Sequence, residues 1–415
     1  MNRTFLGRRD KFTESDVRAA LEYLAKDDST NSVFGLDGII GEYERALASY
    51  HGRQFALLCN SGTSALFSAY FSIGIGPGVD IVAPTFTFPA TVTPALQLGA
   101  KVRLVDCESN SPSIDACAVE EALSPNTKAI VFTHMWGNIA DVLALREVAQ
   151  RHGVYLIEDN SLAIGGSRDG VLTGSLCDVV CFSLGSTKMF SGGQGGALLT
   201  DNLDILERAT LLGHFGRRAF EACQTPKSLQ FADTGFGMNL RMHVLSAAIS
   251  FRRFQSREGL IQARKKRYAL LCEALASSEL INPPVEQYGN DSGSWQGFVA
   301  TISEEGLRIG AESIAGYLAS KDIEVQAFAY YPPLHLRRLF QTRTNGLSER
   351  HGVHPIVYRR GAFPNSEALY DRMLSFPLFL DEPIDEVESY CSRLERGLRE
   401  LRELAVVEQP KPTAA

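Results

Sequence analysis

The sequence of 415 residues has no long apolar run and no excess of basic residues. Nowhere do about 18 apolar residues follow one another, the length that a membrane-spanning helix needs, and residues 1–12 lack the apolar core of a secretory signal. Lysine and arginine number 41 against 48 aspartate and glutamate, for a formal net charge of −7. Basic pairs such as Arg217 and Arg218 are interpreted as solvent-exposed. We therefore predict a soluble protein whose partners are neither nucleic acids nor membranes.

Cysteine is also sparse. The eight cysteines are spread over the chain without a CxxC pair or a dense framework. Such usage is typical of reduced thiols in the cytosol and does not predict structural zinc or another metal site. Cys181 lies in the apolar run 179–182, so we expect it to be a buried core residue. These features predict a cytoplasmic protein without disulfides.

Apolar residues make up 45% of the chain, enough to bury a large core, and the length is typical of two domains. In residues 1–250, short β-branched runs alternate with amphipathic stretches. This alternation is typical of an α/β domain with a mainly parallel sheet and helices on both faces. Helices are expected to begin at Thr13, where Asp16 completes a capping box, and to cover 138–152. The seven predicted strands are 55–59, 80–83, 102–105, 129–133, 155–158, 179–182 and 197–200.

A second domain follows a long basic helical stretch, residues 245–275, that reads as a connector. It carries strand candidates at 297–302 and 323–328 and a helix at about 384–404, which is typical of a smaller α+β domain. We place the boundary near residue 255. The predicted parts are a large α/β domain over 1–255, a small C-terminal α+β domain over 256–407 and a disordered tail over 408–415.

The carboxyl ends of the predicted strands carry the chemistry, because ligands of open α/β sheets bind at that edge. After the strand 55–59, a small polar turn leads into a helix. Backbone N–H groups and a partial positive charge at a helix start attract anions, and Gly62 would let an anion approach closely. The turn therefore predicts a phosphate site. An ordinary helix cap by Ser61 or Thr63 is the alternative.

Two further strand ends carry ionisable side chains. The strand 155–158 leads to Glu158 and Asp159, carboxylates that suit a protonated ring nitrogen, although a metal site or a helix cap is also open. After 179–182 comes Lys188, and the glycine cluster follows this lysine, whereas in a Walker A loop it would precede it. A lysine in such a turn predicts a Schiff-base amine. Phosphate site, carboxylate and lysine together match pyridoxal 5′-phosphate (PLP).

At these positions the chain resembles the DegT/DnrJ-type aminotransferase family, which consists of fold type I PLP enzymes. The resemblance extends over about residues 35–401 and implies Lys188 as the Schiff-base lysine and proton shuttle, with Asp159 beside the ring nitrogen. It implies that Phe88 stacks on the coenzyme ring. The phosphate would be held by Gly62, Thr63 and Ser183. The segments that carry the resemblance are 61–66, 84–91, 158–159, 183–188, 237–242, 332–335 and 374–378.

The resemblance also implies a partner and a substrate region. In this family the asparagine matched by Asn239 reaches the phosphate of the neighbouring subunit, which implies a homodimer with shared active sites. Substrate contacts are expected from Trp136, Tyr331 and His335, with packing as the alternative for Trp136 and a simple turn at 332–333 as the alternative beside His335. Leu162 departs from the family, which usually has Gln or His there.

The function that the resemblance implies is transfer of an amino group from glutamate or glutamine to a keto-sugar, nucleotide-linked in this family, or else to a keto-cyclitol. The product would serve glycan or antibiotic-like biosynthesis. Asn160 and Ser161 also differ from the small apolar residues usual after the aspartate. With Leu162, they motivate an alternative: the same coenzyme used for elimination or carbon–carbon chemistry. A third hypothesis is a non-catalytic regulator that has kept the fold.

Overall fold

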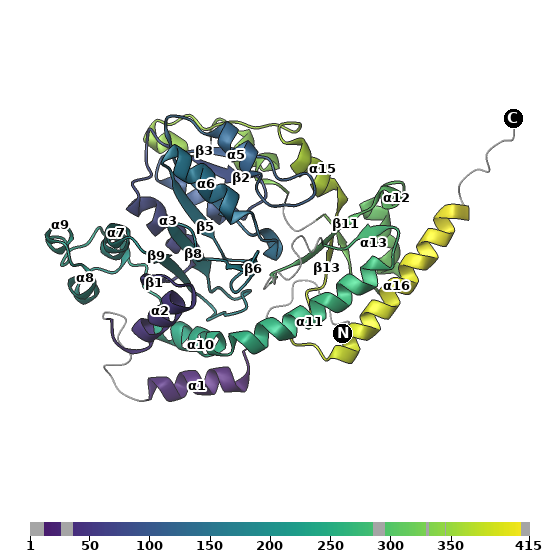
Figure 1. The fold of residues 1–415 in the computed structure, drawn as a ribbon, viewed down its shortest axis with the longest axis horizontal. Coiled ribbons are helices and arrows are strands. Elements are labelled where there is room, and N and C mark those ends of the chain that lie inside the picture. The colour runs from purple at the N-terminus through teal and green to yellow at the C-terminus, as the bar shows by residue number, and fades with distance from the viewer. Residues whose placement is uncertain (1–11, 26–35, 285–294, 329–331, 345, 408–415) are drawn as a thin grey trace.

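The computed structural model describes residues 12–25, 36–284, 295–328, 332–344 and 346–407 (Figure 1). A large sheet with helices on both sides occupies one part of the molecule. A smaller sheet with long helices occupies the other part. Among the residues that the structure describes, no helix is both long enough and apolar enough to cross a membrane.

The large sheet contains seven strands in the order β1-β9-β8-β5-β4-β2-β3. β9 runs antiparallel to its neighbours β1 and β8, and the other pairs are parallel. The prediction of a mainly parallel seven-stranded sheet is therefore confirmed, because each strand coincides with a predicted one. The strands are β1 Phe55–Cys59, β2 Asp80–Pro84, β3 Lys101–Val105, β4 Thr127–Thr133, β5 Tyr155–Asp159, β8 Val179–Ser183 and β9 Gly196–Thr200.

The strands are buried on both faces, and successive side chains join different cores. Leu57 packs into one hydrophobic cluster and Leu58 into the other, as the two-residue period of a strand requires. Cys181 is fully buried, as predicted, and none of the eight cysteines, all within the described residues, is in a disulfide. One face is covered by α3 (Gly62–Ser72), α4 (Thr93–Gln97) and α7 (Leu203–Gly213), and the other by α2 (Gly38–Tyr50), α5 (Ala116–Ala122), α6 (Val142–His152) and α10 (Val244–Gln255).

Helix starts follow their capping residues. α1 (Glu14–Leu24) has the predicted capping box, in which Thr13 Oγ1 accepts from the Asp16 N–H at 3.1 Å and the Thr13 N–H donates to the Asp16 carboxylate at 2.9 Å. The helix predicted over 138–152 begins later, at Val142, because Asp141 caps it by accepting from the Ala144 N–H at 3.0 Å. The shorter elements are β6 (Ser167–Arg168), β7 (Val171–Leu172), α8 (Arg217–Ala222), α9 (Pro226–Leu229), η2 (Pro89–Thr91) and η3 (Met135–Gly137).

The two adjacent arginines of α8 differ in their exposure. Arg217 is exposed and pairs with Glu221 and Asp37. Arg218 is buried and donates to Glu44 at 2.7 Å, so the prediction of a solvent-exposed position was wrong for this residue. Consecutive residues of a helix point in different directions, and α8 turns this arginine toward the buried carboxylate on α2.

The second sheet is antiparallel, in the order β10-β11-β13-β12. The predicted strand 297–302 is β11, whereas of 323–328 only 326–327 form a strand, the short β12. Phe328 has a φ of 59°, leaves the extended conformation and ends this strand. The predicted last helix is α16. The elements are α11 (Arg257–Ala276), β10 (Ile281–Asn282), β11 (Phe298–Ile302), α12 (Glu304–Leu307), α13 (Ala311–Ser320), β12 (Gln326–Ala327), η4 (Leu334–Leu336), α14 (Arg338–Gln341), η5 (Ser348–His351), α15 (Pro364–Arg372), β13 (Met373–Phe376) and α16 (Ile384–Val407).

Figure 1 shows α11 extending from the large sheet toward the small one, where it packs against α16. α10 and α11 are separated at Ser256. The domain boundary near residue 255 stays a prediction, and the predicted disordered tail, 408–415, lies outside the described residues.

The two parts of the protein are in contact at Asp106, which follows β3. Its carboxylate accepts the backbone N–H groups of Asn365 and Ser366, at the start of α15, at 2.9 and 2.8 Å. The α+β character of the second part is confirmed.

Candidate active site

The start of α3 lies against the end of β8. A Cβ atom added at Gly62 would lie 2.8 Å from Ser183 Cβ and 3.2 Å from the Phe182 carbonyl oxygen, so only glycine permits this approach. Ser61 forms an isolated β-bridge with Gly195, just before β9. The structure thus brings together the two predicted phosphate-binding segments, which are more than a hundred residues apart in sequence.

The helix start offers donors to an anion. Ser61 is the N-cap residue, and its hydroxyl accepts from the Ser64 N–H at 3.0 Å, so the ordinary cap that we considered is present. The first N–H groups of a helix have no partner within it. Ser61 uses only one of them, which leaves the Gly62 and Thr63 N–H groups for a ligand. Capping and phosphate binding are therefore compatible at this turn.

Lys188 lies in a compact turn beyond β8. Its N–H donates to the Gly185 carbonyl at 2.9 Å, and its carbonyl accepts from the Ser191 N–H at 3.1 Å. Burial lowers the pKa of the Lys188 amine from 10.5 to about 8, against the opposing attraction of Asp159. A much larger share of this amine is therefore neutral near pH 7 to 8 than of an exposed lysine, as a nucleophile requires.

Asp159 ends β5 and is 4% exposed. Asp159 lies opposite Cys181 of the neighbouring parallel strand β8, so Asp159 and the turn that carries Lys188 leave the same edge of the sheet. One carboxylate oxygen accepts from the Thr91 hydroxyl at 2.6 Å, and the other accepts from the Ser161 hydroxyl at 2.6 Å and from the Ser161 N–H at 3.2 Å. The carboxylate is held in a defined orientation at the edge of the sheet.

Phe88 follows β2 and precedes the turn η2. Its side chain is 50% exposed, so the ring is accessible to a ligand. The Phe88 carbonyl accepts from the Thr91 N–H at 2.9 Å, and Thr91 contacts Asp159. The predicted stacking ring and the predicted partner of the ring nitrogen are thus connected through a single turn.

Glu158 points away from this site. It is fully buried, and one of its oxygens lies 3.0 Å from His134 Nε2 while the other accepts from the Cys177 thiol at 3.3 Å. Because His134 Nδ1 accepts the Ala140 N–H at 3.0 Å, the imidazole proton lies on Nε2. His134 is therefore a neutral donor to Glu158. Of the two adjacent carboxylates, only Asp159 belongs to the site.

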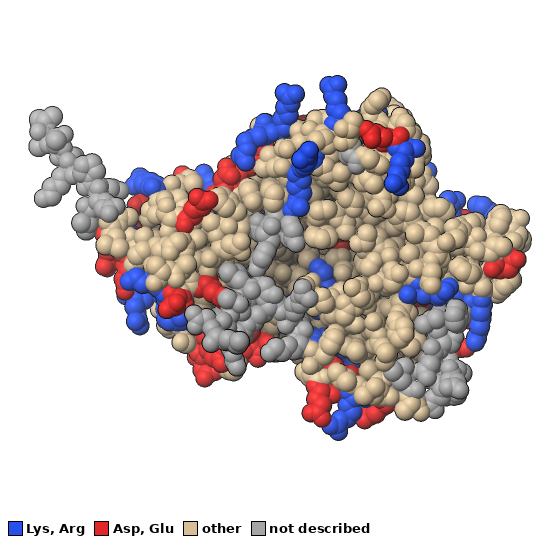
Figure 2. Space-filling model, turned by 180° about the vertical axis from the view of Figure 1, so that it is seen from behind, with Lys and Arg blue, Asp and Glu red and all other residues tan. Residues whose placement is uncertain are grey.

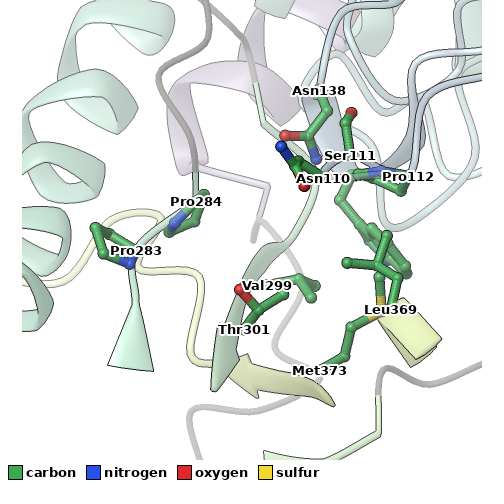
Figure 3. A pocket seen from close by; sticks show the side chains of 11 residues that line it. Asn110, Ser111, Pro112, Asn138, Pro283, Pro284, Val299, Thr301, Leu369 and Met373 are labelled. Atoms are coloured by element: carbon green, nitrogen blue, oxygen red, sulfur yellow. The ribbon is translucent and has the colours of Figure 1, made fainter. Parts of the chain in front are cut away.

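Trp136 lies at the junction of the two parts of the protein. Its φ is 56°, it is only 6% exposed, and its ring lies 5.8 Å from that of Phe86. A Cβ atom at Gly297 would lie 2.8 Å from the indole. Figure 3 shows the pocket beside it, with residues of the large part facing Val299, Leu369 and Met373. The lining residues are Asn110, Ser111, Pro112, Trp136, Asn138, Pro283, Pro284, Val299, Thr301, Leu369 and Met373.

The other predicted site residues are His335, Tyr331 and Asn239. His335 is fully buried with its Nε2 3.0 Å from Glu367, so it holds a packed turn in this structure. Tyr331 lies outside the described residues. Asn239 is exposed, and its carbonyl lies 3.5 Å from the side-chain nitrogen of Asn60, which places this segment beside the phosphate turn.

Some contacts were missed by sequence reasoning. Gln296 precedes β11 and donates its N–H to the Trp136 carbonyl at 3.2 Å, and its side-chain amide donates to the carbonyl of Thr187, the residue before Lys188. Thr91 was not singled out either. Its spacing of four residues from Thr87, in a turn beside the stacking aromatic, is a signal that could have found it. Gln296 has no comparable local signal.

These elements have counterparts in known proteins. Residues 35–395 match the DegT/DnrJ/EryC1/StrS aminotransferase family, most of the chain. The chain belongs to this family. The resemblance seen in the motifs is confirmed, and so is PLP dependence, because the members of this family are PLP-dependent aminotransferases. The residues described above fit that coenzyme: an anion-binding helix start, a buried amine of lowered pKa beside a carboxylate, and a half-exposed aromatic ring.

Two relatives of this DegT/DnrJ/EryC1/StrS protein illustrate the range of named activities. L-glutamine:2-deoxy-scyllo-inosose aminotransferase of Streptoalloteichus tenebrarius is 29% identical over 82% of this chain and 81% of its own length. GDP-perosamine synthase of Caulobacter vibrioides is 32% identical over 59% of this chain and 64% of its own. Among solved structures, the putative sugar aminotransferase Spr1654 of Streptococcus pneumoniae, in its PMP form, has a TM-score of 0.79 at 19% identity, covering 96% of this chain and 98% of that one.

Proposed function

We propose that this aminotransferase moves an amino group from glutamate or glutamine to the ketone of a sugar, nucleotide-linked or free, or of a cyclitol. The observation that carries the proposal is the buried Lys188 amine, with its lowered pKa, beside Asp159 in a chain that matches the family over residues 35–395. The relatives named for a glutamine donor and a keto-cyclitol, and for a GDP-linked sugar, support both acceptor classes.

PLP, when bound, supplies an aldehyde and an electron-withdrawing pyridine ring. The N–H groups of Gly62 and Thr63 and the hydroxyl of Ser183 would hold its phosphate, and the close approach of these two segments supports this role. Phe88 would cover one face of the ring. Asp159 would accept a hydrogen bond from the ring nitrogen and keep it protonated.

Lys188 would act as nucleophile and as proton carrier. Its Nζ atom, neutral in a large fraction of molecules near pH 8, can take a proton from the donor carbon side and return it on the acceptor side. Burial of the amine excludes competing water from this proton. The overall reaction converts the amino donor to a keto acid and the ketone to an amine, which balances without another reagent.

We also propose a homodimer with shared active sites. Phe220, Phe231 and Phe236, around α8 and α9, are 56%, 41% and 40% exposed, and Asn239 follows them in the chain. Large exposed apolar side chains that lie together are typical of a protein interface. The rings of Phe231 and Phe236 lie 5.5 Å apart. Figure 2 shows the molecule from behind, with few charged side chains over the broad area between its centre and its right-hand end. Analytical ultracentrifugation tests the proposal, and a monomer at micromolar concentration would contradict it.

We propose that this enzyme is cytoplasmic and serves glycan or antibiotic-like biosynthesis. The free thiol of the exposed Cys117 suits a reducing compartment. Trp136 is proposed as a substrate contact because it lines the pocket between the two parts. His335 and Tyr331 remain proposed substrate contacts. His335 would need to leave its buried pairing with Glu367 to reach a substrate.

A second candidate is elimination or carbon–carbon chemistry with the same coenzyme. Leu162 favours it, because this residue packs with Phe86, Met135 and Trp136 in an apolar cluster. That side of the site therefore has an apolar wall where a polar side chain is usual in the family. Lys188 and Asp159, which a non-catalytic regulator would not need, argue against the regulator hypothesis.

The experiment supplies the purified holoenzyme with glutamate, glutamine or alanine and then with a panel of keto-sugar nucleotides and keto-cyclitols. We expect one donor to release a keto acid and convert the bound coenzyme to its amine form, and one acceptor to gain about one mass unit as its C=O group becomes CH–NH2. Lys188→Ala should abolish both signals, and Lys266→Ala, a change of an exposed lysine on α11, should preserve them. No keto acid from any donor would refute transamination.

A further inference from the structure

Hydroxyl groups surround the Asp159 carboxylate on both of its oxygens. Thr91 donates to one oxygen and Ser161 donates twice to the other, with both hydroxyl contacts at 2.6 Å. Thr91 is fully buried and Asp159 nearly so. Hydrogen bonds to a charged group are stronger than neutral ones and set its orientation. This arrangement fixes the plane of the carboxylate before any ligand arrives.

The donor and the acceptor of each hydrogen bond at Thr91 can be assigned. An ionised carboxylate only accepts, so the Thr91 hydroxyl spends its one proton on Asp159. The contact of 2.6 Å between Thr87 Oγ1 and Thr91 Oγ1 must then be donated by Thr87. The carbonyl of Thr91 in turn accepts from the Tyr70 hydroxyl at 2.5 Å. Thr91 is therefore anchored through its backbone as well as its side chain.

The same turn carries the predicted stacking ring. Thr87 precedes Phe88, Thr91 is the last residue of η2, and the Thr91 N–H donates to the Phe88 carbonyl at 2.9 Å. Ser161 contributes from the other direction, since its N–H and hydroxyl close a short turn onto Asp159 two residues earlier. Contacts from two separate segments therefore determine how the carboxylate faces the site.

We infer that Thr91 and Ser161 are positioning residues that aim the Asp159 carboxylate at the ring nitrogen of the coenzyme and tie it to the turn of Phe88. The inference rests on the proposed role of Asp159. Neither hydroxyl has to touch the coenzyme. Their effect is transmitted through the carboxylate, so it should be felt by a ligand that has a ring nitrogen and not by one that lacks it.

The test compares two ligands on the apoenzyme. One is PLP, and the other is 1-deazapyridoxal 5′-phosphate, in which C–H replaces the ring nitrogen. Dissociation constants are measured by absorbance and protein fluorescence. For Thr91→Val and Ser161→Ala we expect the Kd of PLP to rise about tenfold, as for loss of one hydrogen bond to a charged group. The Kd of the deaza analogue should change less than twofold.

Three further variants make the result interpretable. Thr91→Ser keeps the hydroxyl and should restore PLP binding to within about twofold of the parent, given the same donor. Thr210→Val is the matched control, because the Thr210 hydroxyl on α7 is also fully buried but has no hydrogen-bond partner among the described residues. It should leave both dissociation constants unchanged. Thermal unfolding of each apoenzyme reports whether a variant folds.

The outcomes distinguish a failure of the positioning role of Thr91 and Ser161 from a failure of the proposed role of Asp159. If Thr91→Val and Ser161→Ala weaken both ligands equally, or neither, the positioning inference is wrong. If the parent protein itself binds the deaza analogue as tightly as PLP, the proposed role of Asp159 fails instead. Should Thr91→Val not fold, Ser161→Ala alone decides, because its side chain is only partly buried and its loss leaves no large cavity.

Discussion

The lysine at the centre of the site should destabilise the protein that carries it. The pKa of the Lys188 amine falls from 10.5 to about 8 because burial disfavours its charged form. At about 1.4 kcal/mol for each pKa unit, keeping this amine protonated in the folded apoenzyme costs about 3 kcal/mol. Lys188→Met, which keeps the length of the side chain and removes the charge, should therefore raise the free energy of unfolding by about 3 kcal/mol at pH 7.

The size of this effect should depend on pH in a defined direction. Below about pH 8, Lys188 is protonated in both the folded and the unfolded chain, and the whole cost is present. Between about pH 8 and 10.5 only the unfolded chain keeps the proton, so the stability of the parent protein rises with pH. The stability advantage of Lys188→Met should therefore shrink across this range and vanish near its upper end.

Urea unfolding of the apoenzyme, followed by circular dichroism at a series of pH values and one protein concentration, measures this difference. Differences between variant and parent cancel the titration of all other groups. Lys266→Met serves as control, since this lysine is exposed on α11 and its loss should change stability by less than about 0.5 kcal/mol. A stability difference that stays constant from pH 7 to 10 would contradict the lowered pKa of the Lys188 amine. So would a Lys188→Met protein that is less stable than its parent at pH 7.

Three further substitutions test the packing around the site. Gly62→Ala should weaken PLP binding about tenfold or more in a titration, because the new methyl group would lie 2.8 Å from a carbon of β8; Gly316→Ala, in open space on α13, should instead stabilise the protein by about 0.5–1 kcal/mol. Gly297→Ala should lower the stability by about 1–3 kcal/mol in urea unfolding, since its methyl group would lie 2.8 Å from the indole at the junction of the two parts, and an unchanged midpoint would contradict that packing. Arg218→Met should cost about 3–5 kcal/mol by leaving Glu44 buried without its cation, and Glu44→Gln in the same chain should recover part of the loss; additive losses in the double variant would argue against a coupled pair.

The strands of the large sheet were predictable because their signal is local. Each is a short apolar, β-branched run bounded by turn residues, and all seven appear where the sequence places them. The segments around Gly62, Asp159 and Lys188 were predictable for a related reason. Their chemistry follows directly after a strand, and the carboxyl ends of parallel strands meet at one edge. The predicted strand 323–328 is an exception, since only 326–327 form β12, which ends before the left-handed φ of Phe328.

Contacts between distant segments could not be derived in this way. The bond from Thr91 to Asp159 spans 68 positions, and that between Arg218 and Glu44 spans 174. Periodicity says which side of a strand or helix is buried, but not which polar group of another element lies opposite. The same holds for Gln296, whose side chain reaches the carbonyl before Lys188 from the other part of the protein.

The amino-acid order thus specifies the strands, the residue types at their ends and the family, because all of these are written in neighbouring positions. The tertiary structure decides which of these side chains lie close to one another. It buries the Lys188 amine and thereby lowers its pKa, turns Glu158 toward His134 and Asp159 toward the site, and surrounds that carboxylate with hydroxyl groups. Desolvation and hydrogen-bond geometry depend on what surrounds a group in three dimensions, and those neighbours come from elements far apart in the chain.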